Sequence, residues 1–355
     1  MRVIHLGDVA GLGGLQNWIC SLAEAQTKRG FAVDLMEPPW AASQGRVFTD
    51  LPVHAWDLMR VRDFDVVHSH GCAGFKNWNI QKLARIPIVH TYYGTVMGIQ
   101  VELRWFQNLL GWNGLDVPRN IIREIAGGQI ADAVVAISPK VRGEVRRYYR
   151  IPKRKIFLIP GGYSRQGETR SKASLRRALG LPKDGFLFLF VGRPDPVKNI
   201  SAVLAALRVA RSRFPDVWLV LAPKQEVSSE QGIIGVELPP QKMSDLYRSV
   251  DALIHPALYD AYSLAVHEAL AHGLPVIVSQ GTGAAYYCTN ELNALILPRK
   301  RGAPLVDALS RLMFSLIESE DLRSRLSTEA ACKFGAMDWD WVAAETEKVY
   351  SSVRA

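Results

Sequence analysis

The chain has 355 residues and is 48% apolar, which predicts two domains of ordinary size with enough apolar side chains to fill both cores. Its four cysteines are widely separated and form no metal-like pair, so we expect reduced thiols in a cytoplasmic protein. The first six residues open a buried strand and no long apolar stretch follows them, which argues against a signal peptide and against a membrane-spanning helix.

Short apolar runs alternate with helical stretches in the first half of the chain. Strands are expected at residues 2–6, 31–36, 66–69, 88–91, 133–137 and 156–159. A glycine-rich turn separates the first strand from a helix expected at 15–29. This alternation predicts an α/β fold with parallel sheets flanked by helices, in which ligands bind beyond the carboxyl ends of the strands.

Pro160, Gly161 and Gly162 form a predicted hinge. The expected organisation is therefore a first domain at 1–162, a polar linker at 163–184, a second domain at 185–337 and a final helix within 338–355.

Two basic residues follow a buried strand in the second half. The apolar run at 186–191 ends at Gly192, and a loop that carries Arg193 and Lys198 leads into a helix expected at 200–210. Two fixed cations at the carboxyl end of a strand can neutralise a diphosphate leaving group without a metal. Arginine grips two oxygens through its planar fork, and lysine supplies a compact point charge. A solvated basic loop is the alternative interpretation.

Two carboxylates, Asp260 and Glu268, stand eight residues apart, the first before a short helix and the second inside it. A strand expected at 275–278 and a glycine-rich turn at 281–283 follow. A helix entered from a loop carries unsatisfied amides, and carboxylates beside it accept hydrogen bonds from sugar or ribose hydroxyls. The arrangement suits a nucleotide sugar. Acids placed only for the helix dipole and for solvent are the alternative.

The segment that begins at Lys140 and ends at Lys155 holds eight basic residues and one acidic residue. Val141, Val145 and Tyr148 recur at helical spacing. The other faces carry Arg142, Arg146, Arg147 and Arg150. A basic amphipathic helix is typical of contact with an anionic membrane surface, and an ordinary solvated face is the alternative. No nucleic-acid partner is expected, because no stacking platform or known binding module accompanies the charge.

The segment from Trp105 to Trp112 places large apolar residues at 105, 106, 109 and 110, which fit one helical face. Buried packing explains this pattern. The alternative is an interfacial anchor or a slot for a lipid acceptor, since tryptophan suits a headgroup boundary. Together with the basic segment, this alternative would place the protein peripherally on the inner face of a membrane.

Motifs that suit a metal are weak. Two Asp-x-Asp stretches, at 63–65 and 338–340, lead into a strand and start a helix, where acids are favoured anyway. His68 and His70 share one face of a strand, a spacing that also suits a metal. With no third ligand evident, we expect a cleft-lining or internally satisfied polar pair and no metal site.

Taken together, these motifs resemble the retaining glycosyltransferases of family 4, also described as glycosyl transferases group 1. Asp260 and Glu268 match the family's pair of acids, and Arg193 and Lys198 match its basic loop. The resemblance covers nearly the whole chain. It implies the GT-B architecture, with two Rossmann-like parallel-sheet domains facing each other across a cleft, and a last helix that crosses back to the N-terminal, acceptor-side domain.

The resemblance also implies roles for particular residues. Arg193, Lys198 and Asp260 would be catalytic: the two cations stabilise the departing diphosphate, and Asp260 faces the transferred sugar. Glu268 would hold the ribose hydroxyls. The other nucleotide-sugar contacts implied are Gly13, Gly14, Leu264, Gly281, Thr282 and Gly283. The residues implied on the sugar or acceptor side are His68, His70, Tyr93 and Ser138.

The sequence departs from the family pattern at several positions. Asp260 is one methylene shorter than the usual glutamate. Tyr93 stands where the family commonly has a histidine that contacts the donor sugar; it could donate one hydrogen bond but is no cation at neutral pH. Gly161 and Ser164 replace the usual Asn and Asp, and residues 284–287 replace the usual Pro-Glu. By the resemblance, these changes affect residues that would recognise the sugar.

The reaction implied is transfer of a sugar from a nucleotide-diphosphate sugar to an acceptor hydroxyl with retention of configuration, in glycan or glycolipid assembly. The nucleotide sugar and a glycan or lipid-linked acceptor are the expected partners, and no cofactor is expected. Two alternatives stay open: a non-catalytic nucleotide-sugar-binding or scaffold subunit, suggested by Tyr93 and Asp260, and a related GT-B enzyme such as an epimerase or a phosphorylase.

Overall fold

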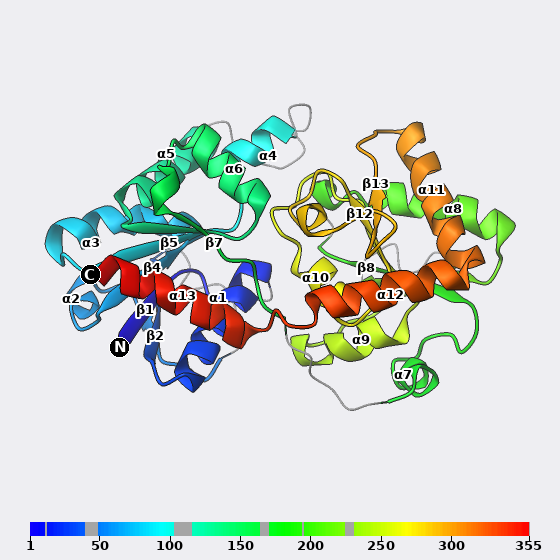
Figure 1. Cartoon of the computed structure of the whole chain (residues 1–355), viewed down its shortest axis with the longest axis horizontal. Helices are drawn as coiled ribbons and strands as arrows, with labels where there is room; N and C mark the ends of the chain where they lie inside the picture. Colours follow the sequence, from blue (N-terminus) through cyan, green and yellow to red (C-terminus); the bar gives the residue numbers. More distant parts are fainter. Residues whose placement is uncertain are drawn as a thin grey trace. The chain divides into compact units, whose positions relative to one another are not determined.

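The computed structural model describes residues 1–10, 13–39, 49–102, 116–163, 170–193, 195–223 and 231–354. The chain divides into two compact units (Figure 1). The first comprises Met1–Gly162 and Met337–Ala355, and the second comprises Tyr163–Ala336. Each unit is built on one parallel sheet flanked by helices, so the predicted α/β fold with two parallel-sheet domains is confirmed.

The first unit contains a seven-stranded sheet in the order β3-β2-β1-β4-β5-β6-β7. Its strands are β1 (Arg2–Leu6), β2 (Ala32–Glu37), β3 (Val53–Ala55), β4 (Val66–His70), β5 (Ile88–Tyr92), β6 (Ala133–Ala136) and β7 (Ile156–Leu158). The central strands β4, β5 and β6 are buried along their whole length, as expected for a parallel sheet covered on both faces.

Helices cover both faces of this sheet. They are α1 (Gly14–Lys28), α2 (Leu58–Val61), α3 (Asn77–Leu83), α4 (Val96–Glu102), α5 (Asp116–Ile130), α6 (Pro139–Tyr148) and α13 (Trp339–Arg354), with short 3-10 turns η1 (Gly71–Lys76) and η2 (Lys153–Lys155). The C-terminal helix α13 packs against α1 on one face, and α3 packs against α5 on the other (Figure 1). The last helix of the chain is thus part of the first unit.

The second unit contains a six-stranded parallel sheet in the order β10-β9-β8-β11-β12-β13. Its strands are β8 (Phe186–Val191), β9 (Val217–Ala222), β10 (Ile233–Gly235), β11 (Ala252–His255), β12 (Val276–Ser279) and β13 (Leu295–Leu297). Its helices are α7 (Lys172–Ala178), α8 (Ile200–Arg213), α9 (Met243–Ser249), α10 (Leu264–Ala271), α11 (Ala303–Glu318) and α12 (Glu320–Phe334), with turns η3 (Pro196–Lys198), η5 (Pro240–Lys242) and η6 (Ala284–Tyr287).

The core of the second unit lies between its sheet and the helices α8 and α11. Phe188 and Phe190 of β8 are buried there with Leu309 and Met313 of α11. On the other side, α12 packs against α10 and α7 packs against α9. Because α10 carries Glu268, its packing against α12 and beside β12 fixes the orientation of that acid in the unit.

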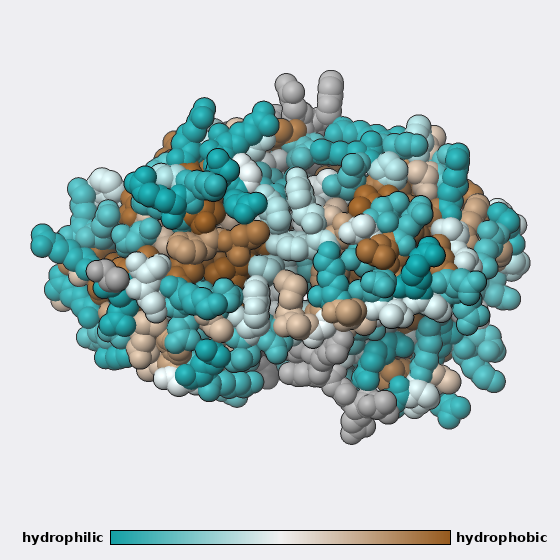
Figure 2. Space-filling model, in the orientation of Figure 1, coloured by the Kyte–Doolittle hydropathy of each residue, from teal (hydrophilic) through white to brown (hydrophobic). Residues whose placement is uncertain are grey.

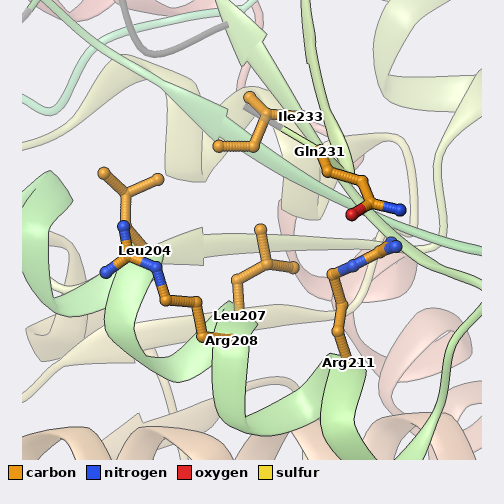
Figure 3. Close-up of a pocket in the computed structure, with 6 residues that line it drawn as sticks. All are labelled: Leu204, Leu207, Arg208, Arg211, Gln231 and Ile233. Atoms are coloured by element: carbon orange, nitrogen blue, oxygen red, sulfur yellow. The ribbon is translucent and has the colours of Figure 1, made fainter. Parts of the chain in front are cut away.

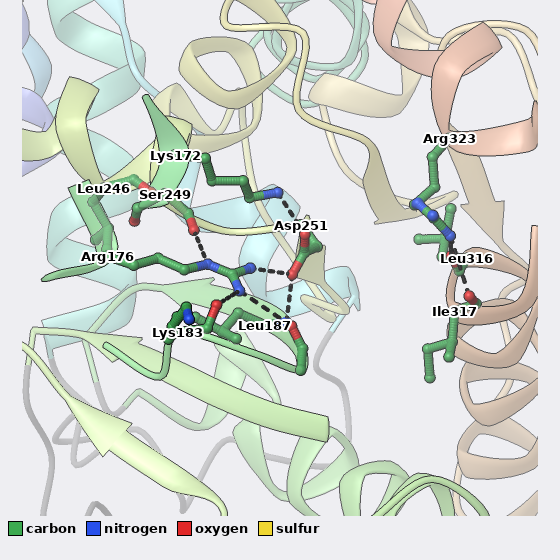
Figure 4. A network of polar contacts seen from close by, with 11 residues as sticks. Lys172, Arg176, Lys183, Leu187, Leu246, Ser249, Asp251, Leu316, Ile317 and Arg323 are labelled. Carbon is green, nitrogen blue, oxygen red and sulfur yellow. Dashed lines mark hydrogen bonds and ion pairs between the residues drawn. The ribbon is translucent and has the colours of Figure 1, made fainter. Parts of the chain in front are cut away.

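The segment expected as a linker at 163–184 belongs to the second unit. Its helix α7 is fastened by Arg176, which donates to the main-chain oxygen of Ser249 at 2.9 Å and to Asp251 Oδ2 at 2.7 Å (Figure 4). Lys172 bonds the other oxygen of Asp251 at 2.5 Å, and the Leu187 N–H donates to Oδ2 at 2.7 Å. The linker prediction is corrected because these bonds attach α7 to the start of β8 and the end of α9.

The predicted strand positions agree with the structure to within one or two residues; the strand expected at 31–36, for example, is Ala32–Glu37. The helix expected at 200–210 runs on to Arg213. Among the described residues, no helix combines the length and the apolar character needed to cross a bilayer.

Candidate functional site

The carboxyl end of β8 passes into the loop that carries the two predicted phosphate-binding cations. Gly192 ends the strand with a φ of 157°. Asp195 caps the turn η3 by accepting a hydrogen bond from the Val197 N–H at 3.0 Å, and Asn199, with a left-handed φ of 58°, starts α8. The backbone is therefore fixed on both sides of Lys198, which lies at the end of η3.

Lys198 pairs with the first acid of the acidic motif. Its Nζ lies 2.6 Å from Oδ2 of Asp260, and the two side chains are 25% and 10% exposed. The Leu258 N–H donates to the main-chain oxygen of Val197 at 2.8 Å, which ties the two loops together. The basic motif and the acidic motif thus form one cluster at the carboxyl edge of the second sheet, where ligands of parallel α/β sheets bind.

His255, the last residue of β11, joins this cluster and was not singled out from the sequence. It is buried, and its Nε2 lies 3.0 Å from Asp260 Oδ2 without good hydrogen-bond geometry. Burial opposes the ionised form of Asp260, but Lys198 and His255 outweigh it and hold the pKa of Asp260 below its usual range. Burial lowers the pKa of His255, and Asp260 offsets part of that effect. A histidine at the carboxyl end of a buried strand was the available signal.

Asp260 is also bonded to the backbone around it. Its Oδ1 accepts a hydrogen bond from the Tyr262 N–H at 3.1 Å, and its main-chain oxygen accepts one from the Gly283 N–H at 2.8 Å. Ser263 then starts α10 with a φ of 64°, an uncommon left-handed conformation for serine. Strained backbone of this kind persists where surrounding contacts hold it, often at ligand sites. The Asp260 carboxylate therefore has a fixed position.

Glu268 is the fifth residue of α10 and is half-buried. Its Oε2 accepts a hydrogen bond from the Tyr247 hydroxyl at 2.7 Å. Burial raises the pKa of Glu268, and the Tyr247 hydrogen bond offsets part of that rise. No second donor reaches this carboxylate within the described ranges, so Oε1 keeps its lone pairs for the hydroxyls of a ligand.

The glycine-rich turn after β12 contains hydrogen bonds of its own. Thr282 is fully buried, and its hydroxyl donates to the main-chain oxygen of Ser279 at 2.8 Å. The Gly283 N–H donates to the main-chain oxygen of Asp260, so both groups have partners within the protein. Contact of Thr282 and Gly283 with a nucleotide stays a prediction. Gly281 lies beside a further cation, because a Cβ at Gly281 would come within 3.0 Å of Arg299 Nε.

The other predicted contacts of the nucleotide sugar lie at element ends. Arg193 is exposed and makes no ion pair with any described residue. Leu264 is the first residue of α10. Gly14 is the first residue of α1 and Gly13 is its N-cap with extended backbone, where a Cβ would overlap the side chain of Gln16. Only the flexible end of the Gln16 side chain would have to shift to make room for that Cβ.

At the carboxyl edge of the first sheet, two predicted sugar-side residues serve the protein itself. Ser138 is fully buried, and its Oγ accepts a hydrogen bond from the Val141 N–H at 3.1 Å, which caps α6. His68 is 1% exposed, and its two ring nitrogens bond Tyr350 at 2.7 Å and Thr91 at 2.6 Å. The structure therefore gives Ser138 and His68 structural partners, and their contact with a ligand stays a prediction.

Tyr93 differs from the other predicted sugar-side residues of the first unit because it is not fully buried. It is half-buried directly after β5, and its hydroxyl lies 2.8 Å from Nδ1 of the buried His70. The ring of Trp18 meets its ring edge-on at 5.3 Å. The buried His70 therefore contacts the Tyr93 hydroxyl from the protein interior.

A third histidine, His5, joins His68 and His70 in a buried cluster. The parallel register pairs His5 with His68, which no local motif reveals. Three imidazoles are a donor set suited to a transition metal. However, His5 Nδ1 lies 2.8 Å from His70 Nε2, and both nitrogens of His68 have partners. These donors fit a metal only if those hydrogen bonds are broken.

The Asp-x-Asp stretches are engaged in structural contacts. Asp65 Oδ2 accepts a hydrogen bond from the Arg2 N–H at 2.7 Å. Asp338 Oδ1 caps the start of α13 by accepting from the Trp341 N–H at 2.8 Å, and Asp340 pairs with Arg29 at 3.2 Å.

Two surface hollows lie apart from these clusters. One, of about 400 Å³, is in the second unit and is lined by Leu204, Leu207, Arg208, Arg211, Gln231 and Ile233 (Figure 3). Arg211 donates to the main-chain oxygen of Val217 at 2.5 Å and lies over Trp218, so its guanidinium is engaged with β9. The other, of about 450 Å³, is in the first unit and is lined by Gly143, Arg146, Arg147, Arg150, Ile151 and Lys153.

The structure divides the basic segment into two parts. Lys140 is only 9% exposed in its side chain and pairs with Glu102 at 3.2 Å and Glu144 at 3.4 Å. Lys155 donates to two main-chain oxygens, at 3.1 and 2.8 Å. Lys140 and Lys155 therefore do not contribute to the exposed basic face. The exposed remainder, named here the α6 basic face, is Arg142, Arg146, Arg147, Arg150, Lys153 and Arg154. The aromatic segment from Trp105 to Trp112 lies outside the described residues.

Comparison with known proteins places the two units in described families. Residues 171–332 match the family described as glycosyl transferases group 1, and residues 12–166 match the one described as glycosyltransferase family 4. A D-inositol 3-phosphate glycosyltransferase of Streptomyces scabiei is 26% identical over 332 residues, covering 86% of this chain and 72% of the relative.

Solved structures share the fold. Sucrose-phosphate synthase from Thermosynechococcus elongatus superposes with a TM-score of 0.79 at 19% identity, covering 99% of both chains. Anabaena Alr3699/HepE in complex with UDP and glucose gives a TM-score of 0.81 at 14% identity, covering 99% of this chain and 100% of that one. With two parallel-sheet units that both match glycosyltransferase families, the chain is a glycosyltransferase of the two-domain GT-B architecture.

Proposed function

We propose that this glycosyltransferase moves a sugar from a nucleotide-diphosphate sugar to an acceptor hydroxyl with retention of configuration. The observation that carries the proposal is the Lys198–Asp260 pair at the carboxyl edge of the second sheet, with the exposed Arg193 in the same loop as Lys198. An ammonium has three N–H donors, so Lys198 keeps donors for phosphate oxygens while it bonds Asp260. Arg193 adds a planar fork for the same diphosphate.

In this proposal the cations stabilise the negative charge that develops on the departing diphosphate, which is the largest catalytic term in such transfers. Glu268 accepts hydrogen bonds from the ribose hydroxyls through its uncommitted oxygen. The backbone at Gly281 lies beside Arg299, which extends the cationic surface. The site needs no metal to neutralise the leaving group, because protein cations do so.

Retention is proposed through a front-face transfer, in which the leaving phosphate takes the acceptor proton. A double displacement would need a carboxylate that is free to attack the sugar. Asp260 does not suit that role, because it is held by Lys198 and by the Tyr262 N–H. We therefore assign Asp260 to positioning Lys198 and to facing the sugar, rather than to nucleophilic attack.

A nucleoside diphosphate donor is supported by the relatives. One relative is a D-inositol 3-phosphate glycosyltransferase, and a structure of Anabaena Alr3699/HepE is in complex with UDP-glucose. A thermal-shift screen with UDP, GDP and ADP, each with and without its sugar, tests this directly. We expect one base to stabilise the protein, by roughly 3 kcal/mol at a hundred times its dissociation constant. No response to any nucleotide diphosphate would contradict the donor assignment.

The acceptor is proposed to be a glycan or a lipid-linked glycan at a membrane surface. The α6 basic face supplies six exposed cations. The surface over the neighbouring edge strand β7 is apolar (Figure 2), and the three residues of this strand are half-buried. Basic side chains beside an apolar strip suit an anionic bilayer interface. The protein would then act as a peripheral protein on the inner face of that membrane.

Transfer is distinguished from the alternative functions by its products. Incubation with the donor and a membrane extract should release nucleoside diphosphate and attach the sugar to a lipid or glycan. A scaffold subunit would bind the donor without turnover, an epimerase would convert the donor without an acceptor, and a phosphorylase would release a sugar phosphate. Any of these three outcomes would contradict the proposed transfer.

A further inference from the structure

A continuous chain of hydrogen bonds crosses the core of the first unit. It starts at Tyr93, whose hydroxyl lies 2.8 Å from His70 Nδ1. It continues over 2.8 Å from His70 Nε2 to His5 Nδ1, and over 2.7 Å from His5 Nε2 to Oε1 of Gln26 on α1. These hydrogen bonds link, in order, the residue after β5 with side chains of β4, β1 and α1.

The same chain continues to the C-terminal helix. Gln26 Nε2 donates to the hydroxyl of Tyr350, on α13, at 3.0 Å. The Tyr350 hydroxyl lies 2.7 Å from Nδ1 of His68, and Nε2 of His68 lies 2.6 Å from Oγ1 of Thr91. Every member after Tyr93 is buried. Water therefore offers these groups no alternative partners, and each must form its hydrogen bonds with its neighbours in the chain.

The amide of Gln26 sets the direction of the first half of the chain. Because its oxygen faces His5, that ring must carry its proton on Nε2 and accept on Nδ1. His70 then donates through Nε2 and accepts through Nδ1, so the proton in the last bond comes from Tyr93. Burial lowers the pKa of His5 to about 4 and that of His70 well below its usual value, so each ring has one proton.

The second half has the same direction. Gln26 donates to the oxygen of Tyr350, so Tyr350 gives its own proton to Nδ1 of His68. His68 then donates through Nε2 to Thr91. Every bond points from Tyr93 toward Thr91, and all three imidazoles are the Nε2–H tautomer.

We propose that Tyr93 is a hydrogen-bond acceptor that recognises a hydroxyl group of the sugar donor or of the acceptor. Its one proton is committed to His70, and no other described residue bonds its oxygen. What remains for a ligand is a lone pair at the carboxyl edge of the first sheet. This reverses the expectation from the sequence, in which Tyr93 donates a hydrogen bond to the sugar.

The chemistry of the ligand group follows from this polarity. A hydroxyl can donate to the Tyr93 oxygen, whereas a phosphate or carbonyl oxygen would face it lone pair to lone pair and be rejected. Burial raises the pKa of Tyr93 well above its usual value, so the phenol stays neutral. The identity of the hydroxyl rests on the proposed function, but the polarity of Tyr93 does not.

Histidine tautomers provide the first test and need no substrate. Nitrogen NMR of the full-length protein with ¹⁵N-labelled histidine reads which ring nitrogen carries the proton. We expect Nε2–H at His5, His68 and His70 at neutral pH. Tyr93→Phe removes the donor to His70 and identifies that signal. An Nδ1–H tautomer at His70 would overturn the proposal, because the ring would then donate to Tyr93.

Tyr350→Phe is the matched control, because it removes a buried phenol hydroxyl on the far side of Gln26. We expect His5 and His70 to keep their tautomers in this variant, since the Gln26 oxygen still faces His5. A change of tautomer at His70 would mean that Gln26 does not set the direction and would overturn that step.

Kinetics of Tyr93→Phe provide the second test. We expect KM to rise about tenfold for the substrate whose hydroxyl is recognised, the loss of one neutral hydrogen bond. The dissociation constant of the free nucleoside diphosphate should not change. Unchanged KM values for both donor and acceptor would overturn hydroxyl recognition. Wild-type protein without transfer activity would instead contradict the proposed function, and the tautomers would still decide the polarity of Tyr93.

Discussion

Lys198 and Asp260 are 62 residues apart in the chain, yet their side chains form a hydrogen-bonded ion pair of 2.6 Å. The pair joins two motifs that the sequence presents separately, a basic loop after β8 and an acidic loop before α10. Asp260 holds the ammonium in place in the absence of a ligand. The lysine is therefore oriented before a diphosphate arrives, which lowers the reorganisation needed for catalysis.

Removing either cation should reduce turnover. We expect Lys198→Ala and Arg193→Ala each to lower kcat by about 10²-fold or more, because a preorganised donor to the developing charge is lost. Steady-state kinetics with the donor found by the nucleotide screen measures this. Lys242→Ala, at an exposed lysine of the same unit, is the control and should leave kcat unchanged. Near-normal turnover in both site variants would contradict the diphosphate assignment.

The two carboxylates should separate binding from transfer. Glu268→Gln removes an ionised acceptor of ribose hydroxyls and should weaken binding of the free nucleotide by about tenfold. Asp260→Asn should leave that affinity near normal but reduce kcat, because Lys198 loses its charged partner. Calorimetry with the free nucleotide and kinetics with the donor give the two readouts. The opposite pattern would mean that the roles of the two acids are exchanged.

Glu124 should make the stability of the protein depend on pH. Burial raises its pKa to about 7, and hydrogen bonds from the Tyr149 hydroxyl and the Val96 N–H offset part of the rise. The folded state therefore binds the proton more tightly than the unfolded chain, whose reference value is 4.5. Stability from this group is fully present below pH 4.5 and is lost as pH rises through about 7. Its size is of the order of 3 kcal/mol.

Urea unfolding between pH 5 and 8 measures this dependence. Glu124→Gln, which stays neutral at every pH, should flatten the decline in unfolding free energy. Asp63→Asn changes an exposed carboxylate of the same unit and should leave the decline unchanged. An equal decline in the wild type and in Glu124→Gln would show that other groups cause it.

Much of the second unit's site could be predicted from sequence because its residues lie in local motifs. Lys198 follows a buried strand and Asp260 precedes a short helix, so the edge of the sheet brings both together. His255 was not predicted because its one signal, a histidine at the carboxyl end of a buried strand, belongs to no motif. Thr282 was assigned to the ligand because the pattern of a glycine turn does not show where a hydroxyl points; here it bonds Ser279.

In the rest of the chain, contacts between distant segments limit what the sequence alone can predict. His5 and His68 meet only through strand register, and Tyr350 reaches His68 from a helix 282 residues away. The helix α7 was predicted to be part of a linker because its attachment to the second unit depends on an ion pair between Arg176 and the distant Asp251. Sequence patterns show which faces are apolar, but not which buried polar groups satisfy one another.

The α6 basic face should bind anionic membranes. Each basic residue near such a surface contributes about 1 kcal/mol, which salt screens. Reversing Arg142, Arg146 and Arg147 to glutamate changes the charge by six units at the centre of this face. We expect the variant to lose sedimentation with vesicles that contain phosphatidylserine, while binding of the free nucleotide persists. Lys140 stays out of the test because its ion pairs support the fold.

A matched charge reversal shows whether position matters or only net charge. Arg177, Lys242 and Lys300 are exposed in the second unit, and changing all three to glutamate alters the net charge equally. This control should still sediment with the vesicles at low salt, because the α6 basic face is intact. Equal loss in both variants would point to nonspecific attraction of a protein with formal net charge +9. Wild-type protein that stays in the supernatant would favour a soluble acceptor, since the basic face would then only be solvated.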